Sequence, residues 1–300
     1  SFFAVLLASD NGGTVTPTDG SVTTSKFASG VAIGATGTAN TLAGIPFFSD
    51  SSNSSMYTHD VSGTDDTAQY NTAFGFNALD AITTGDKHVA IGYNAGTAVT
   101  EAVGNVLIGE AAGASITTGG SNTLIGRLVG DGFDTEANNT AIGVAALGGS
   151  VAGGEYNVAI GNYALDALTS ADYNTVVGYN AGTATTTGGY NVMFGANAGL
   201  DHTEGQSNVF IGANAGANQT TGSGEIYIGS GAGTTTVTGT TNASEPNTFV
   251  GYTAGYSITG ETSNTYIGRV ADGTGTPNGC EFNVGVGNYA FQDLTTGDYN

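Results

Sequence analysis

Apolar residues recur at a fixed interval along most of the chain, from about residue 71 to residue 300. The repeated segment has the form Asn-x-x-Ile-Gly, and its glycine recurs from Gly75 to Gly287 at intervals of 17 residues, with single intervals of 18, 19 and 22. The residue before this glycine is Ile, Val or Phe, and the residue three before it is β-branched. Residues two apart on a strand share a face, and β-branched side chains favour strands. The pattern therefore predicts one short strand per repeat, with these two columns inside.

A repeat of constant length, in which no unit can bury its own apolar face, is typical of a solenoid. We predict an all-β fold, a parallel β-solenoid (β-roll) of about thirteen 17-residue turns over residues 71–300 that continues beyond residue 300. Seventeen residues leave room for a second, weaker strand, expected around Ile82, Val99 and Ile116. Residues 1–70 lack the regular repeat and are expected to form an N-terminal linker, collar or cap.

A polar column precedes the predicted strands. Four residues before the repeated glycine the chain has Asn, replaced only by His88 and Glu225. Stacked amide side chains can form hydrogen bonds along the coil axis and satisfy backbone groups of the turns. We interpret this column as a structural ladder, and His88 as a substitute for Asn in it and not as a metal ligand.

A third column lies between the two that we place inside, two residues before the glycine. Alternation along a strand puts it on the opposite face, so we expect it to point outward. An apolar stripe facing water indicates a contact with another chain, and we predict a side-by-side homo-oligomer. The alternative is that the turns of the second strand cover this stripe within the same chain. The candidate interface stripe is Ala73, Leu107, Leu124, Val176, Met193, Phe210, Tyr227, Phe249 and Tyr266.

The charge balance excludes two classes of partner. The chain has 25 acidic residues against 4 basic ones, with a net charge of -21. Nucleic acids are bound mainly through Lys and Arg, and anionic membrane surfaces also attract basic segments. We therefore expect neither nucleic-acid binding nor membrane insertion, and the apolar run at residues 1–7 is too short to span a bilayer.

Motifs that carry catalysis or metal binding are not recognisable in the sequence. The three histidines, His59, His88 and His202, have no zinc-ligand spacing, and no glycine-rich segment is followed by the Lys-Ser/Thr of a phosphate loop. We expect no enzyme activity, no metal and no cofactor. If a loop contacts a receptor, the expanded turn before Gly251 is the candidate, with Thr241, Asn242, Ser244 and Glu245, because binding residues are often on loops held by a rigid scaffold.

The segment Asn-Thr-Ala-Ile-Gly at 139–143, with close copies at 71–75, 157–161 and 174–178, resembles the repeat of trimeric autotransporter adhesin heads. It is equally similar to repeats of bacteriophage tail fibres, and residues 14–26 resemble tail-fibre linker segments. The resemblance covers residues 71–300 and implies parallel β-rolls packed as a homotrimer. The adhesin heads have a shorter turn than this chain.

These features together predict a structural or adhesive fibre segment at the virion surface or outside the cell. Our leading hypothesis is the shaft of a phage tail fibre or virion appendage that serves host attachment. The alternative is a bacterial cell-surface adhesin or extracellular filament subunit, which would bind its target through the solenoid itself. The expected partners are other copies of the chain and a host-surface receptor.

Overall fold

The structure is a computed structural model that describes residues 40–42, 45–50, 55–58, 67–149, 153–234, 246–256, 262–271, 281–291 and 298–299. All regular elements in these ranges are β-strands, most of them three residues long. The strands are β1 Asn40–Leu42, β2 Ile45–Asp50, β3 Ser55–Tyr57, β4 Thr72–Phe74, β5 Val89–Ile91, β6 Val106–Ile108, β7 Thr123–Ile125, β8 Thr140–Ile142, β9 Val158–Ile160, β10 Thr175–Val177, β11 Val192–Phe194, β12 Val209–Ile211, β13 Ile226–Ile228, β14 Thr248–Val250, β15 Thr265–Ile267 and β16 Val284–Val286.

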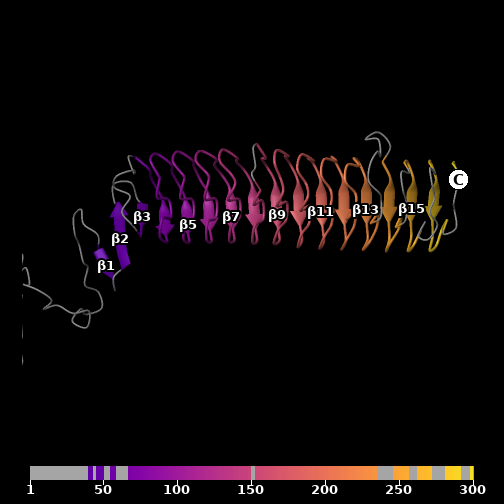
Figure 1. Ribbon diagram of the computed structural model, residues 1–300, viewed down its shortest axis with the longest axis horizontal. Helices are drawn as coiled ribbons and strands as arrows, with labels where there is room; N and C mark the ends of the chain where they lie inside the picture. Colours follow the sequence, from indigo (N-terminus) through magenta and orange to yellow (C-terminus); the bar gives the residue numbers. More distant parts are fainter. Residues whose placement is uncertain are drawn as a thin grey trace, which may run out of the picture. The chain divides into compact units, whose positions relative to one another are not determined.

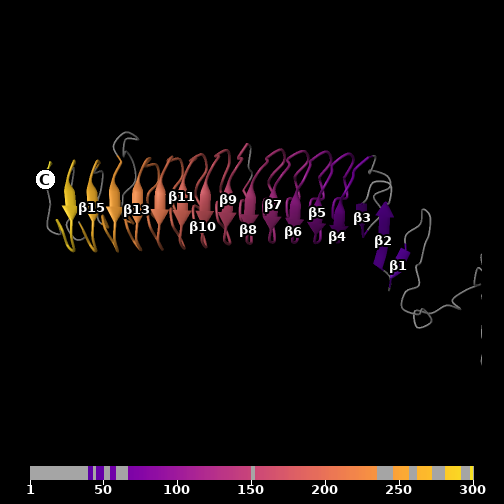
Figure 2. The same cartoon turned by 180° about the vertical axis from the view of Figure 1, so that it is seen from behind.

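Strands β3–β16 form one parallel sheet in which each strand pairs with the next in the chain. Figures 1 and 2 show β4–β16 side by side in chain order, one from each coil. Residues 17 apart are opposite each other in the regular coils, as Val192 is to Val209. The predicted parallel β-solenoid with a 17-residue repeat is confirmed. At a strand spacing of about 4.8 Å, β4–β16 extend over roughly 60 Å.

The strands before the solenoid are antiparallel. β1 pairs with the first half of β2, and Phe48–Asp50 of β2 pair with β3. Contacts within the chain divide it between Phe47 and Phe48 into two units. In the second unit, the antiparallel segment of β2 therefore occupies the first edge of the solenoid sheet, and edge strands otherwise present unpaired backbone groups.

The two faces of the strands are the reverse of those predicted. The middle residue of each strand from β4 to β15 is fully buried within the coil, whereas the first and third residues are half-buried or exposed. The predicted interface stripe, from Ala73 to Tyr266, is therefore the core. The assignment was wrong because the coil is too thin for two β-branched columns: its interior takes one side chain from each strand. We call this series the strand-centre column.

The sizes of two side chains are complementary in most coils: that of the strand-centre residue and that of the residue six positions later. Where the strand residue is small, the later residue is large, as in Ala73/Leu79, Ala141/Leu147, Ala159/Leu165 and Gly285/Phe291. Where it is large and both positions are described, the later residue is glycine, and an added Cβ at Gly113 would lie 2.9 Å from Leu107 Cδ2. Towards the C-terminus the strand-centre column becomes a stack of rings, Phe210, Tyr227, Phe249 and Tyr266, with centroids 5.0–5.3 Å apart. The coil of β5 is the exception, because Ala90 and Gly96 are both small, and a Cβ added at Gly96 would lie 2.5 Å from Leu107 Cδ1 of the next coil. The other coils described at both positions fill their interior from one of two sources.

The side of the coil opposite the strands consists of turns in the described residues, so the predicted second strand is not found there. Consecutive turns are closed by hydrogen bonds from Ala78 N–H to Gly75 O and from Ile82 N–H to Leu79 O. Neighbouring coils are still joined on this side, for example by Leu79 N–H to Ala95 O at 3.1 Å. Ile82, Val99 and Ile116 point inward as expected and are fully buried.

The predicted asparagine ladder is confirmed. Each side-chain oxygen accepts the backbone N–H of the ladder residue in the next coil, as Asn174 Oδ1 does from Asn191 at 2.9 Å. Each amide nitrogen donates to a backbone carbonyl fourteen residues later in most coils, as Asn174 Nδ2 does to Gly188 O at 3.0 Å. The ladder residues described are at most 1% exposed. The column therefore satisfies buried backbone groups along the whole solenoid.

The repeated glycine is required by both conformation and space. Gly178 has φ +148°, which L side chains rarely adopt, and a Cβ added there would lie 2.6 Å from the carbonyl carbon of Gly195 in the next coil. Gly75, Gly126 and Gly251 have the same environment. The coils approach one another this closely because no side chain intervenes.

Candidate functional site

The principal surface feature is the side of the solenoid sheet that points away from the core. It consists of the first and third residues of β4–β16, and we call it the outward face. Every one of these residues is Thr, Val, Ile or Phe. Phe74 is 47% exposed, Phe194 57% and Val286 68%. A continuous, uncharged and largely apolar surface of this kind on a folded chain marks a contact site.

The size of the outward face matches a protein–protein interface. With strands about 4.8 Å apart and two side-chain columns across, the face measures roughly 60 Å by about 12 Å, or about 700 Å². Stable interfaces bury about 800 Å² on each partner. The face is regular because the same three-residue strand recurs in register. It is therefore large enough to hold a second chain.

The charge distribution points to the same surface. The chain has a net charge of -21, but the outward face has no ionisable side chain. The described acidic residues of the solenoid coils, such as Asp80, Asp131 and Asp166, lie in the turns or next to the ladder, except Glu225, which is a ladder residue. Burial raises the pKa of the Asp131 and Asp166 carboxyls. Contact through the outward face would therefore bury side chains without burying any ionisable group of that face.

The residues predicted as sites lie elsewhere. The stripe residues are fully buried inside the coil and cannot contact another chain. Thr241, Asn242, Ser244 and Glu245 of the expanded turn lie outside the described residues. The outward face was missed although its two columns had been identified, because they were assigned to the core.

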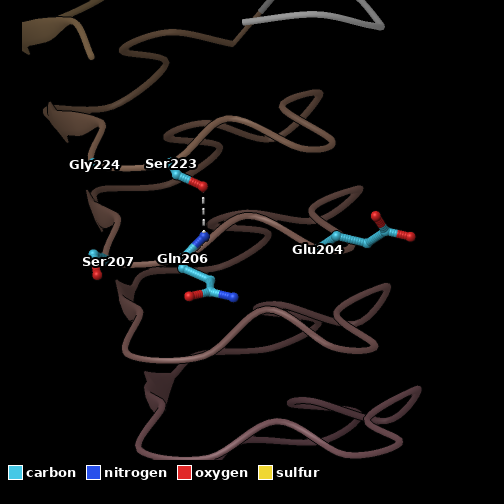
Figure 3. A pocket seen from close by; sticks show the side chains of 5 residues that line it. All are labelled: Glu204, Gln206, Ser207, Ser223 and Gly224. Carbon is cyan, nitrogen blue, oxygen red and sulfur yellow. Dashed lines mark hydrogen bonds between the residues drawn. The ribbon is translucent and has the colours of Figure 1, made fainter. Parts of the chain in front are cut away.

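A small polar depression lies in the turns that precede β12 and β13 (Figure 3). Glu204, Gln206, Ser207, Ser223 and Gly224 line it, and Gln206 N–H donates to Ser223 Oγ at 2.9 Å. Glu204 stands apart from the other four residues in this view. The depression offers hydrogen-bonding groups and one carboxylate.

Exposed aromatic side chains form short stacks outside the sheet face. Tyr173 lies between Tyr156 and Tyr190 with ring centroids 5.0 Å away on each side. Arg269 lies over the rings of Tyr252 and Tyr289, at 5.7 and 5.3 Å from their centroids. The tyrosines of the stack cover each other's faces, so these contacts join neighbouring coils.

The buried titratable groups are associated with the ladder. Burial lowers the pKa values of His88 and His202, and raises that of Glu225 to about 7. His88 and Glu225 are ladder residues, and Asn208 Nδ2 lies 3.2 Å from His202 Nε2. In the described ranges, no three His, Cys, Asp or Glu residues are grouped so as to hold a metal ion. The described residues also include no helix long and apolar enough to cross a membrane.

No protein-family model, curated protein or solved structure matches this chain. The repeat and the surfaces of the solenoid are therefore the basis for a functional proposal.

Proposed function

We propose that this chain is a structural shaft segment of a fibre, in which copies pack side by side through the outward face. The apolar, uncharged outward face is the observation that carries the proposal. The continuous sheet and the asparagine ladder support it as well, because they join every coil to the next by backbone and side-chain hydrogen bonds. Such a repeat suits a spacer that holds one end of an assembly away from the other.

The setting that we propose is a phage tail fibre or virion appendage, located at the particle surface and used for host attachment. A homotrimer is the assembly that the resemblance of the repeat implies. Three copies would each direct the outward face towards the shared axis and leave the acidic turns in water. The fibre would carry its receptor-binding part elsewhere, and the shaft would supply length.

Sedimentation equilibrium on the wild-type chain and three charged variants tests the self-association. Ile142→Asp and Phe194→Asp place a carboxylate on the outward face, where the native side chains are 37% and 57% exposed. Phe76→Asp is the matched control, because Phe76 is more exposed, at 69%, but lies in a turn. Burying an unpaired charge costs several kcal/mol, so the two face variants should dissociate and the control should not.

A wild-type chain that sediments as a stable monomer would contradict the assembly. Equal dissociation by Phe76→Asp would contradict the choice of face. Antibody labelling in electron microscopy then tests the setting: appendages of virions should be labelled along their shafts, whereas label on a cell envelope would favour the adhesin.

A further inference from the structure

Two rungs of the asparagine ladder are titratable. His88 and Glu225 occupy positions that are asparagine in the other coils described. An asparagine rung accepts one hydrogen bond and donates another, and it does so at any pH. Histidine and glutamate can do both only in one protonation state.

His88 reproduces the asparagine contacts atom for atom. Its Nδ1 accepts the backbone N–H of Asn105 at 3.1 Å, and its Nε2 lies 2.8 Å from Ala102 O. The preceding rung makes the same pair of contacts, from His88 N–H to Asn71 Oδ1 and from Asn71 Nδ2 to Gly85 O. Only the neutral imidazole with its proton on Nε2 satisfies both. A second proton on Nδ1 would face the Asn105 N–H, donor against donor.

The surroundings of His88 do not compensate such a charge. The ring is fully buried. Asp86, two residues earlier, is the charged group that acts on it and favours protonation, but burial has the larger effect and the pKa is lowered. The side chain of Lys87 is exposed. Protonation at His88 therefore breaks a rung of the ladder between β5 and β6.

Glu225 has the opposite requirement. Its Oε2 accepts the backbone N–H of Asn247 at 2.7 Å and the hydroxyl of Tyr227 at 3.0 Å. Its Oε1 is buried and has no hydrogen-bond partner among the described residues, while the Asn247 side chain also forms a hydrogen bond with the carboxyl. A carboxylate has no donor to replace an asparagine Nδ2, whereas a protonated carboxyl has one. Tyr227 is the titratable group facing it, and no cation is among the described groups that act on it.

We propose that His88 and Glu225 are proton-sensitive joints of opposite sign in the ladder. Acid opens the contact between the β5 and β6 coils, and alkali opens the contact between the β13 and β14 coils. Between these limits both residues are uncharged and the ladder is continuous. The inference concerns the solenoid itself and does not depend on the proposed self-association.

Hydrogen exchange measured by mass spectrometry on the full chain tests both joints. Each amide that a titratable rung holds is compared with the amide held by the next asparagine rung: Asn105 with Asn122, and Asn247 with Asn264. The Asn105/Asn122 protection ratio should fall about tenfold or more between about pH 7.5 and about pH 5. The Asn247/Asn264 ratio should fall by at least about tenfold between about pH 5.5 and about pH 8.5.

His88→Asn and Glu225→Gln are the matched variants, because each supplies the same acceptor and donor without titration. Each should abolish the pH dependence at its own joint and leave the other joint unchanged. Ratios that stay constant with pH in the wild-type chain would overturn the proposal, and this comparison needs no variant. A pH dependence that persists in a folded His88→Asn or Glu225→Gln chain would overturn the assignment to that residue.

Discussion

Volume exchange inside the coil can be tested by a double-mutant cycle at Leu124 and Gly130. Both belong to the coil of β7, where Leu124 is fully buried and an added Cβ at Gly130 would lie 2.8 Å from Leu124 Cδ1. The following coil has the reverse arrangement, with Ala141 on the strand and Leu147 in the turn. Leu124→Ala and Gly130→Leu together would therefore reproduce a packing that the solenoid already contains.

The magnitudes follow from the two ways in which a core is damaged. Leu124→Ala alone leaves a cavity and should cost about 2–5 kcal/mol. Gly130→Leu alone overpacks the same space, at about 1–3 kcal/mol, and adds about 1 kcal/mol of left-handed backbone strain at φ +53°. Leu147 has φ 51°, so the turn accommodates a leucine. In the double variant the new leucine fills the cavity, and a favourable coupling of about 3 kcal/mol is expected.

Equilibrium urea unfolding followed by far-UV circular dichroism measures the four corners of the cycle. Ile125→Ala provides the matched control, because Ile125 is the next residue of the same strand but points to the outward face. It should show no coupling with Gly130→Leu. Additive effects of Leu124→Ala and Gly130→Leu would refute the packing, and coupling of Gly130→Leu to Ile125 instead would refute the assignment of the strand faces.

Three further changes test the glycine column, the ladder and its titratable rung. Gly178→Ala should destabilise the solenoid by about 2–4 kcal/mol through strain and the clash with Gly195, measured as a lower urea midpoint; an unchanged midpoint would contradict the close approach. Asn174→Ala should cost about 2–4 kcal/mol, because it leaves Asn191 N–H and Gly188 O buried without their partner. A change near zero in the free energy of unfolding of Asn174→Ala, as expected for an exposed residue, would contradict the ladder. Glu225 has its pKa raised from 4.5 to about 7, so the native state loses stability as pH rises through this range. Glu225→Gln should therefore be about 3 kcal/mol more stable than the wild type at about pH 8 and gain nothing at about pH 4; a gain independent of pH would contradict this.

The sequence was sufficient to predict the repeat, the position of the one strand that each coil contributes from β4 to β16, and the parallel pairing of these strands. These depend on spacing, which the recurring glycine from Gly75 to Gly287 makes explicit. The ladder was also predictable, including the role of His88, because a single substituted position in a stacked column must make the contacts of its neighbours. The spacing of the repeat and the asparagine column were therefore read correctly from the sequence.

The assignment of faces failed because β-branching was taken as a sign of burial. In a coil this thin, regular β-branched columns suit the flat outer side of the sheet. Two signals in the sequence indicated the correct face. The buried ladder residue and the strand-centre residue, such as Asn157 and Ala159, are two apart and share a side. The residue six positions after the strand centre also indicated its size: Leu79 and Leu147 follow a small strand-centre residue, and Gly130 follows a large one.

The turns were the other limit of prediction. The second side of the coil was expected to be a strand, but its residues close consecutive turns. Several non-glycine residues there and before the ladder have left-handed backbones, such as Asn94 at φ 56° and Tyr173 at φ 60°. Asparagine adopts this conformation readily, but a tyrosine in the sequence gives no indication of it. At the tyrosine positions, contacts between coils and not local propensity therefore determine the conformation.

The central claim is that the outward face joins copies of this chain, and a distance between identical residues of neighbouring chains tests it most directly. A nitroxide attached through Ile142→Cys, in a chain that also carries Cys280→Ser, places one label on the outward face. A second chain labelled through Phe76→Cys places the label in a turn. Pulsed electron–electron double resonance should give a short, narrow inter-chain distance for the first label and a longer one for the second. The absence of inter-chain coupling at residue 142, or a shorter distance at residue 76, would contradict the account.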